Sequence, residues 1–564
     1  MRREYQMGLA AGLLAASAAH VTAQTVPDAG SLLQQIEQNR PIPLPGKSER
    51  VLAPLPAPMT ALPGPTATVA AFRFAGNTLL SDAELGPSVA SFLNRPLSFG
   101  ELQNAAIAVA TRYREAGWVV RAYLPAQEVK DGIVLIQVVE AKFGGLRLEE
   151  KARSPISSAQ LEAIVEANQP KGAPLNANAL DRALLLMEDL PGLAPNASLA
   201  QGRNEYETDL VLSPGAARPF RGEAAADNTG SPSTGRAHLN ATLAWANPLG
   251  RGDSETLAYM HSSGSDYLRA AASLPVGPRG WRIGASLSYL QYKLVSDAFA
   301  ALDVHGNSFT AGLDASYPLI RSRLSNLYLS LNADHKQFDN NAAGLTVTKY
   351  KIDSLSVALT GNRYDGLGLG GASTVSVALV AGKVDLDGSP NRSADAAGPN
   401  TAGSYAKLKY NLSRTQAVSE RITLSGQFSG QFGNKNLDSS ERFYLGGASG
   451  VRAYPGSEGG GSDGQMLILE ARARLPHDFT LIGFYDWGHV TVNRNNDFIG
   501  AAAVNSLTLK GAGVSLAWTN AQGMSVRGTL ARRIGSNPVP TADGNDSDGT
   551  LVKNRLWLSA SVPF

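Results

Sequence analysis

The chain has 564 residues, a formal net charge of +2 and no cysteine. This length exceeds that of one ordinary compact domain and leaves room for two or three. The lack of cysteine excludes disulfides and thiolate metal sites, and the nearly balanced charge argues against nucleic-acid binding, which needs clustered Lys and Arg.

The first residues have the pattern of a secretory signal peptide. Arg2-Arg3 supply the positive charge, Met7–Ala19 form a short apolar core, and Val21-Thr22-Ala23 match a small-residue cleavage site. We therefore expect residues 1–23 to be removed and the protein to leave the cytoplasm. An uncleaved membrane anchor is the alternative, but the apolar stretch is short and rich in alanine.

Residues 24–40 contain a short candidate helix that Asp28 can cap. A helix of about a dozen residues is marginal in water. It therefore either docks on another part of the protein or belongs to a disordered tail. Its apolar residues recur at helical spacing, namely Leu32, Leu33 and Ile36.

The candidate helix is followed by a proline-rich segment, residues 41–66. Eight of its 26 residues are proline. Such a segment favours extended polyproline geometry and cannot pack a core. The sequence therefore predicts a spacer here.

Residues 67–142 and 143–214 have the pattern of two copies of one small α/β unit, in the order β-α-α-β-β. In the first copy, helices are predicted to begin after Ser81 and Ser98, each followed three residues later by glutamate. Ser157, with glutamine three residues later, repeats this capping-box pattern in the second copy. A duplicated module is typical of an elongated binding arm.

From residue 215 to Phe564 the hydrophobic pattern has a period of two. Segments of ten or more residues are linked alternately by short turns, such as Asn247–Gly252, and by long polar loops, such as Asp387–Thr401. This pattern predicts a mainly β fold, an outer-membrane β-barrel with a polar lumen, and we count sixteen strands. A large soluble β-domain is the alternative, and the leader and terminal Phe564 argue against it.

One segment, residues 433–463, breaks the alternation of the barrel. It is rich in glycine and contains Val451-Arg452-Ala453-Tyr454, one Arg between apolar residues, which suits an inward-folded hairpin. A following strand carries Phe484-Tyr485-Asp486-Trp487-Gly488. Because an Asp in the lumen can accept two hydrogen bonds from one guanidinium, the sequence predicts that Arg452 pairs with Asp486.

At these residues the chain resembles two-partner secretion transporters of the TpsB type, the haemolysin/haemagglutinin secretion and activation family of the POTRA plus β-barrel translocase superfamily. Leu445–Tyr454 is similar to the L-G-G-x-x-x-V-R-G-[YF] element of that family, and Phe484–Gly488 is similar to its F-x-D-x-G strand motif. Gly76-Asn77-Thr78 resembles the segment that closes the first strand of a POTRA domain. The resemblance covers essentially the whole mature chain.

The resemblance implies roles for the residues named above. Arg452 would reach down the lumen to Asp486, as a tether or as a gate, although the pair could also hold the loop without any transport step. The α/β units would be POTRA domains, the helix with Leu32, Leu33 and Ile36 a plug, and Phe564 a barrel-assembly signal. The tip glycine of the family is Ala453 here, where a left-handed backbone would be strained. The gating and tether set is Val451, Arg452, Ala453, Tyr454, Phe484, Asp486 and Gly488.

The implied function is recognition and secretion of a large exoprotein, with its activation as a further role. Implied partners are the unfolded exoprotein, captured by the POTRA domains in the periplasm, outer-membrane lipid, the barrel-assembly machinery and periplasmic chaperones. We expect no nucleic acid, cofactor or metal.

Three other functions are open at this point. An outer-membrane assembly insertase of the same superfamily usually carries more than two POTRA-like units. A passive porin would not need residues 67–214. An enzyme embedded in a barrel would need a catalytic set, and no serine, histidine and acid set stands out in the sequence.

Overall fold

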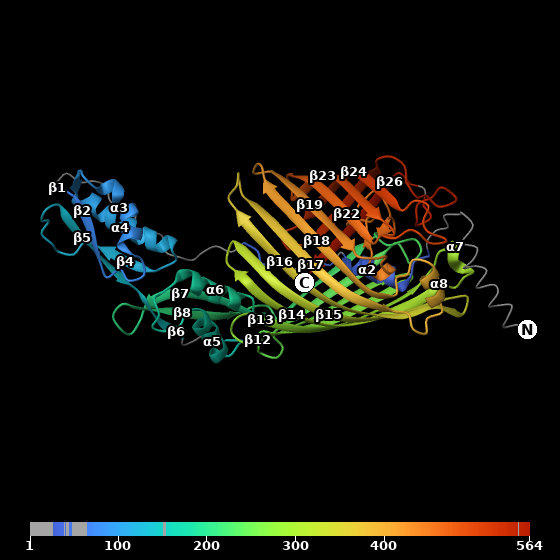
Figure 1. Cartoon of the computed structure of the whole chain (residues 1–564), viewed down its shortest axis with the longest axis horizontal. Helices are drawn as coiled ribbons and strands as arrows, with labels where there is room; N and C mark the ends of the chain where they lie inside the picture. The colour runs from blue at the N-terminus through green and yellow to red at the C-terminus, as the bar shows by residue number, and fades with distance from the viewer. Residues whose placement is uncertain (1–25, 39, 41–43, 48–64, 150–153, 551) are drawn as a thin grey trace, which may run out of the picture.

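The computed structural model describes residues 26–38, 40, 44–47, 65–149, 154–550 and 552–564. The predicted signal peptide and most of the proline-rich spacer lie outside the described residues. Two small α/β units follow one another at one end of the molecule, and a large barrel forms the other end (Figure 1). Helix α2 (Ala29–Gln38) lies inside the barrel, where it contacts three wall strands.

The first α/β unit is a three-stranded sheet covered by helices. Its central strand β5 pairs in parallel with β2 and antiparallel with β4. The structure adds a small ladder that the sequence pattern did not predict, between β1 and β3. The elements are β1 Thr66–Thr68, β2 Ala71–Ala75, α3 Asp82–Val89, η2 Ala90–Phe92, β3 Pro96–Ser98, α4 Phe99–Glu115, β4 Val120–Tyr123 and β5 Ile133–Glu140.

Local sequence signals explain where the helices of this unit begin. The Glu101 carboxylate accepts a 2.8 Å hydrogen bond from the backbone N–H of Ser98, the residue before α4. This bond, with others from the Arg95 and Ser98 side chains, lowers the pKa of Glu101 to about 2. The apolar face of α4 then packs on the sheet through the buried Val109 and Tyr113.

The second unit repeats this topology. Its sheet order is β6-β8-β7, with β6 parallel and β7 antiparallel to the central β8, as in the first unit. The capping box predicted at Ser157 is only half formed, because the Gln160 side chain donates instead to the carbonyl oxygen of Arg251 on the barrel. The elements are β6 Lys142–Leu148, α5 Ser158–Asn168, α6 Ala177–Glu188, β7 Leu193–Gln201 and β8 Glu207–Ala216.

The described part of the chain confirms the predicted closed barrel of sixteen strands. Every strand pairs antiparallel with the next, and β26 closes the cylinder by pairing with β9. The strands are β9 Phe220–Asp227, β10 His238–Ala246, β11 Ser254–Ser262, β12 Ser265–Val276, β13 Trp281–Lys293, β14 His305–Arg321, β15 Ser325–Ala342, β16 Leu345–Asp365, β17 Gly371–Asp385, β18 Gly403–Ala417, β19 Ile422–Gly433, β22 Asp463–Arg474, β23 Phe479–Thr491, β24 Ser506–Thr519, β25 Ser525–Arg533 and β26 Asn554–Pro563.

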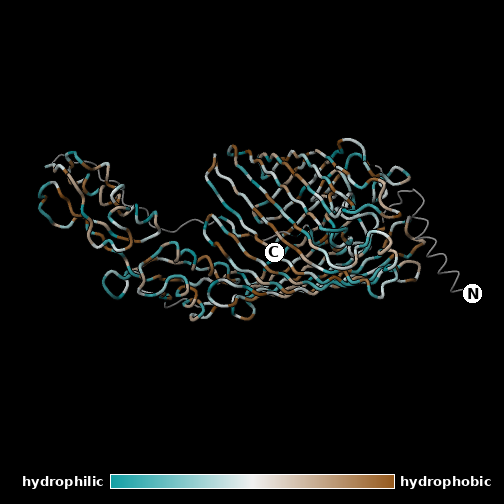
Figure 2. The backbone as a smooth tube through the Cα atoms, in the orientation of Figure 1, coloured by the Kyte–Doolittle hydropathy of each residue, from teal (hydrophilic) through white to brown (hydrophobic). Residues whose placement is uncertain are grey.

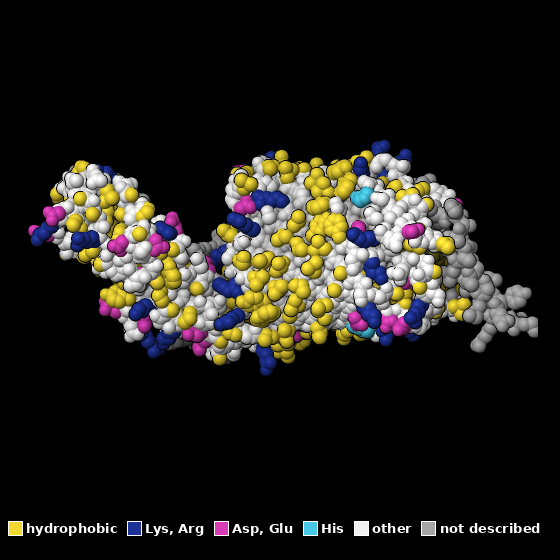
Figure 3. All heavy atoms as spheres, in the orientation of Figure 1, with side chains coloured by type: hydrophobic (Ala, Val, Ile, Leu, Met, Phe, Trp, Pro, Cys, Tyr) yellow, Lys and Arg dark blue, Asp and Glu magenta, His cyan; other side chains and the backbone are white. Residues whose placement is uncertain are grey.

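The period-two pattern directs apolar side chains outward. Hydrophobic and hydrophilic residues alternate along the barrel strands (Figure 2). On the face of the barrel shown in Figure 3, hydrophobic side chains gather over the wall, and charged side chains lie toward its two ends. On β26, for example, Leu556 and Leu558 are half-exposed on the outer face, whereas Trp557 between them is buried. No helix in the described ranges is long and apolar enough to cross a membrane.

The connections differ between the two ends of the barrel, although less regularly than expected. At the end beside the α/β units they are short turns, such as that between β12 and β13. At the opposite end most are long, and two of them carry the short helices α7 (Asp297–Ala300) and α8 (Arg392–Ala397). The β15–β16 connection at that end is nevertheless a two-residue turn. Ala343 and Gly344 both have positive φ there, as a tight hairpin turn requires.

The second α/β unit is fastened to the rim of the barrel. The Arg321 guanidinium at the end of β14 donates two 2.8 Å hydrogen bonds to the Asp189 carboxylate, just after α6. Arg323 forms a 3.0 Å ion pair with Asp181 on α6. The unit is therefore positioned by the short barrel turns. Further contacts of this rim are Asn247 Nδ2 to the carbonyl oxygen of Pro155 and Gln160 Nε2 to that of Arg251.

The carboxylate of Glu140 ties the end of β5 to the turn after β2. It accepts hydrogen bonds from the backbone N–H groups of Thr78 and Leu79 at 2.7 and 2.8 Å, and from the Tyr113 hydroxyl at 3.0 Å. Burial raises the pKa of Glu140, but the bonds from Thr78 and Leu79 outweigh burial and leave the pKa below its usual value.

This depressed pKa predicts a pH-dependent local stability. Its contribution is present above the pKa of the unfolded chain, about 4.3, and is lost as the pH falls through the folded pKa. We expect Glu140→Gln to lower hydrogen-exchange protection of the Thr78 and Leu79 amides at pH 7 by about tenfold, since a hydrogen bond to a charged group contributes about 1.5–3 kcal/mol. The difference should shrink toward pH 3. Hydrogen-exchange mass spectrometry on the full chain measures it, and equal protection at pH 7 would contradict the prediction.

Candidate functional site

The long connection between β19 and β22 folds into the lumen instead of outward. Its two limbs meet in a small antiparallel pair, β20 (Phe443–Tyr444) with β21 (Gly460–Gly461), after the short helix η3 (Ser439–Glu441). Its tip is buried: Val451 and Ala453 are fully shielded from solvent. We call residues 434–462 the inward loop.

Arg452 anchors the tip of this loop to the barrel wall. Its Nε and Nη2 donate to the two carboxylate oxygens of Asp486 at 2.9 and 2.7 Å, and its backbone N–H donates to Oδ2 at 3.0 Å. The remaining guanidinium nitrogen, Nη1, donates to Glu470 Oε1 at 2.8 Å. Because Asp486 is fully buried, this is a desolvated, bidentate ion pair.

The local sequence of β23 explains why it receives the Arg. Alternation places Phe484, Asp486 and Gly488 on the same, lumen-facing side of the strand. The Phe484 ring lies beneath the guanidinium, 3.5 Å from its central carbon. A side chain at Gly488 would collide with Leu445, since an added Cβ would lie 2.7 Å from it. Phe484 thus stacks on the guanidinium, Asp486 pairs with it, and Gly488 leaves room for Leu445 of the loop.

Two contacts of Arg452 were missed by sequence reasoning. Glu470 lies on β22 directly opposite Phe484, so the period-two register of that strand could have identified it as lumen-facing. Trp557 on β26 donates its indole N–H to the carbonyl oxygen of Arg452 at 2.8 Å. The alternation puts Trp557 on the inner face, but no sequence signal identifies its partner.

The strain expected at Ala453 does not occur. Ala453 is not among the residues with positive φ, whereas Gly447, earlier in the loop, has φ +102°. The methyl group of Ala453 packs against Gly511, where an added Cβ would lie only 2.7 Å away. The turn is therefore made by glycine elsewhere, and Ala453 fills a close-packed position.

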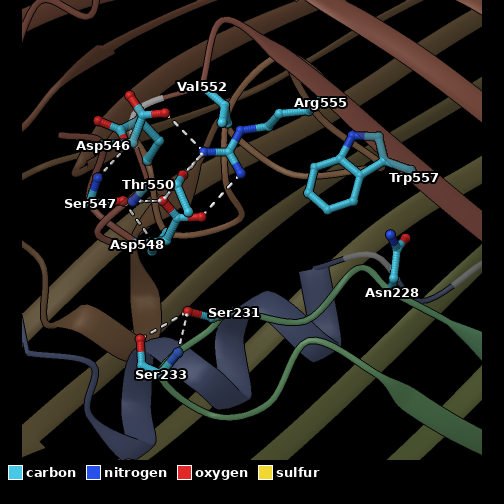
Figure 4. Close-up of polar contacts among 12 residues, drawn as sticks. Asn228, Ser231, Ser233, Asp546, Ser547, Asp548, Thr550, Val552, Arg555 and Trp557 are labelled. Carbon is cyan, nitrogen blue, oxygen red and sulfur yellow. Dashed lines mark hydrogen bonds and ion pairs between the residues drawn. The ribbon is translucent and has the colours of Figure 1, made fainter. Parts of the chain in front are cut away.

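The connection between β25 and β26 covers the inward loop. Arg555 is directed at Asp546 and Asp548, with which it forms ion pairs of 2.9 and 3.0 Å (Figure 4). The neighbouring Ser547 donates its backbone N–H to Glu458 of the inward loop at 2.9 Å. Tyr454 completes the contact, since the guanidinium of Arg533 lies 4.5 Å from its ring centre.

Helix α2 occupies the lumen beside the inward loop. Asp28 caps it by accepting a 2.6 Å hydrogen bond from the Ser31 N–H. Leu33 is buried in an apolar cluster with wall residues, and Leu32 and Ile36 pack against the same cluster. The helix is therefore docked, which differs from the disordered tail that the sequence left open. Farther along the chain, the Pro45 carbonyl accepts a 2.7 Å hydrogen bond from Asn362 on β16.

Phe564, the last residue, lies at the closing seam of the barrel. Its backbone exchanges two 2.9 Å hydrogen bonds with Gly222 of β9, and its side chain is 66% exposed on the outer surface. Among the described residues no group of three or more His, Cys, Asp and Glu side chains is placed to hold a metal ion.

Comparison with known proteins gives one family and several relatives. Residues 207–516, more than half of the chain, match the family described as haemolysin secretion/activation protein ShlB/FhaC/HecB, and residues 67–141 match the POTRA domain of ShlB type. The heme/hemopexin transporter protein HuxB of Haemophilus influenzae strain 86-028NP is 25% identical over 95% of both chains. The outer membrane transporter CdiB of Dickeya dadantii is 25% identical over 80% of this chain and 81% of its own length.

The fold also matches a solved structure. CdiB from Escherichia coli superimposes with a TM-score of 0.72 at 22% identity, covering 96% of this chain and all of that one. At this identity the likeness concerns the fold.

The unequal contacts of Arg452 predict unequal effects of its two carboxylate partners. The chain has no cysteine, so thiol labelling of a Val451→Cys variant reports on exposure of the tip alone. We expect Asp486→Asn to speed labelling by about a hundredfold or more, because breaking a buried ion pair costs about 3–5 kcal/mol. Glu470→Gln, which removes the partner of one nitrogen, should have a smaller effect. Equal rates in the two variants would contradict this reading of the geometry.

Proposed function

Because this chain belongs to the ShlB/FhaC/HecB family of haemolysin secretion/activation proteins, it is an outer-membrane transporter of two-partner secretion with periplasmic POTRA domains, and we propose that it exports one large, unfolded exoprotein through the lumen of its barrel. The POTRA domains capture this exoprotein in the periplasm. The inward loop and helix α2 close the lumen until export begins. Activation of the exoprotein during its passage is a further role within this proposal.

The observation that carries the proposal is the content of the lumen. The inward loop and α2 lie in it, and Arg452 fastens the loop to Asp486 and Glu470 by a desolvated ion pair. Removing one partner of such a pair leaves an uncompensated buried charge, which is strongly unfavourable. We therefore assign Arg452 and Asp486 to the gate, with Val451, Ala453, Tyr454, Phe484 and Gly488 as its packing.

The second POTRA domain offers a place for an extended polypeptide. A groove runs between α6 and β7, with an apolar floor that includes Leu180, Leu184 and Leu199. β7 pairs with β8 on one side, and no described strand pairs with its other side. A segment of the exoprotein can add to this free edge by main-chain hydrogen bonds and place alternate side chains in the groove.

The rim contacts align this groove with the pore. Arg323, on the turn between β14 and β15, lines the groove and pairs with Asp181 of α6. A polypeptide held on β7 is therefore bound beside the mouth of the barrel. The proposed domain limits are 67–142 and 143–214 for the POTRA domains and 215–564 for the barrel, with α2 and the proline-rich spacer before them.

The remaining parts of the proposal concern energy and partners. Family members are transporters, and we propose that this chain works without catalysis, with folding of the exoprotein outside the cell providing direction. The apolar belt meets outer-membrane lipid. Periplasmic chaperones deliver the chain to the barrel-assembly machinery, which recognises the terminal Phe564.

The rival functions are less well supported. A passive porin needs an open lumen, and here α2 and the inward loop occupy it. An assembly insertase shares the barrel and the POTRA topology, but the helix and its proline-rich spacer suit a pore that is closed between rounds of export. A porin would not need residues 67–214 at all, and the POTRA domains of an insertase would not need to recognise one cognate exoprotein.

Export should depend on the Arg452 anchor. We expect Arg452→Ala to abolish export while the barrel remains inserted, because the sixteen-strand ladder does not use this side chain. Arg452→Lys, which keeps the charge but cannot form the bidentate pair, should retain partial export. Culture supernatants of cells with and without each variant measure export, and heat modifiability of the barrel in outer-membrane fractions measures assembly. Normal secretion by Arg452→Ala would contradict the gating proposal.

Capture should depend on the groove of the second POTRA domain. We expect Leu184→Glu to lower export at least about tenfold, since even a polar group left unpaired in an apolar site costs about 1–3 kcal/mol. Leu249→Glu, at a residue that is 62% exposed on a periplasmic turn, is the matched control and should export normally. If the two variants secrete equally well, the groove is not the capture site.

A further inference from the structure

The first limb of the inward loop has an anchor of its own. Residues 438–444, which we call the platform, precede the Arg452 tip and contain the buried Glu441. Glu441 Oε1 pairs with Lys336 of β15 at 2.9 Å, and Oε2 pairs with Lys407 of β18 at 2.7 Å. The carbonyl oxygen of Glu441 accepts further bonds, from Lys407 Nζ and from Gln431 Nε2 of β19, both at 2.8 Å.

This cluster is more than a surface ion pair. Glu441, Lys407 and Gln431 are all less than 5% exposed. Burial raises the pKa of Glu441, but the charges of Lys336 and Lys407 outweigh burial and hold the pKa well below its usual range. Removing one partner of such a buried network leaves an unsatisfied charge, which is strongly unfavourable.

The platform is also the surface on which α2 is seated. Ser439 Oγ donates to the Asp28 carboxylate that caps the helix, at 2.9 and 3.0 Å. Gln34 Nε2 donates to the carbonyl oxygen of Arg442 at 3.0 Å. Gln38 both donates to and accepts from the backbone of Tyr444, at 2.9 and 3.1 Å.

The barrel wall makes fewer of the hydrogen bonds that hold α2 than the platform does. The N–H of Ala29 donates to Asn340 of β15 at 2.8 Å. Gly30 lies so close to the platform that an added Cβ would be 2.8 Å from Ser439 Oγ. Most of the directional contacts that place α2 therefore depend on the position of the platform.

The two anchors of the inward loop use different wall strands. Arg452 binds β22 and β23 through Glu470 and Asp486, and Trp557 of β26 binds its carbonyl oxygen. The Glu441 anchor uses β15, β18 and β19. The ion pairs of the two anchors share no residue, so the two sets of charged contacts are separate, although Phe443 of the platform packs in the same apolar cluster as Val451 and Ala453 of the tip.

We propose that Glu441 is a positioning residue that seats helix α2 in the pore, and that its anchor releases independently of the Arg452 anchor. The resting pore is thus closed by two separate locks, one for the helix and one for the loop tip. This inference rests on the proposed closing role of the helix and the loop. It adds that the helix can leave while the tip stays in place.

Thiol labelling distinguishes the two locks, because the chain has no native cysteine. Leu33→Cys places the thiol on the buried face of α2, and Val451→Cys places it at the buried tip. Each reporter is combined separately with Glu441→Gln, with Arg452→Ala and with the control Glu420→Gln, which removes an exposed carboxylate on a periplasmic turn. The purified full-length barrel, without any exported protein, is labelled with a maleimide.

We expect Glu441→Gln to speed labelling of Leu33→Cys by about tenfold or more, since a bond to a charged group contributes about 1.5–3 kcal/mol, and to leave Val451→Cys protected. Arg452→Ala should speed labelling of Val451→Cys and leave Leu33→Cys protected. Glu420→Gln should match the parent at both reporters. Unchanged Leu33→Cys labelling in Glu441→Gln, or parallel exposure of both reporters in either variant, would overturn the proposal.

A simple structural role for Glu441 has a different signature. It would weaken the whole barrel, so heat modifiability is measured for every variant. If Glu441→Gln does not insert, Glu441→Asp serves instead: it keeps the charge, but its shorter side chain cannot reach both lysines, and it too should expose Leu33→Cys selectively. Because labelling needs no exoprotein, its failure is distinguishable from failure of the export proposal, which the secretion assay tests.

Discussion

The ion pair between Arg452 and Asp486 is the interaction on which the arrangement of the lumen depends. A guanidinium and a carboxylate are removed from water there, and each is fully engaged by the other, by Glu470 and by the backbone N–H of Arg452. Desolvation makes such a pair costly to break one partner at a time. In this structure the pair holds the loop tip at the wall of the barrel.

The rest of the inward loop is organised around this fixed tip. Phe484 stacks beneath the guanidinium, Gly488 leaves room for Leu445, and Trp557 fixes the carbonyl oxygen of Arg452. The connection between β25 and β26 then covers the loop through Glu458 and the carboxylates paired with Arg555. Along the same wall, on β15, β18 and β19, Glu441 holds the platform that carries α2. The lumen of the barrel in this way holds a loop and a helix through charged and polar contacts, which can be exchanged for water, together with two apolar clusters around Leu33 and Val451.

The same reasoning applies at the periplasmic rim. Arg321 and Arg323 pair with acidic residues on and just after α6, so the last POTRA domain is placed at the mouth of the pore and not merely connected to it by the chain. In the proposed capture, the free edge of β7 would bind the exoprotein beside the pore. The short barrel turns on this side can serve as a docking surface because they are short, whereas the longer connections at the opposite end cover the loop and lumen.

Much of this protein was predictable from its sequence because the signals are local. Period-two alternation determines which side chains of β23 and β26 face the lumen, capping residues mark the helix starts after Ser81 and Ser98, and proline marks the spacer. The duplicated β-α-α-β-β order and the sixteen-stranded closed barrel followed from these patterns, and the Val451–Tyr454 motif indicated the family. Asp486 was recognised as a partner of Arg452 because both belong to short motifs.

What only the tertiary structure decided are the contacts between segments that are distant in sequence. Glu470 and Trp557 contact Arg452, and Lys336 and Lys407 pair with Glu441. The Gln160 side chain donates a hydrogen bond to the barrel rim instead of capping its own helix. No local pattern specifies any of these partners. The reason is physical: strand alternation determines the face of a side chain but not what crosses the lumen to meet it. That choice depends on barrel closure, on strand register and on the path of a loop and a helix that fold inside after both are set.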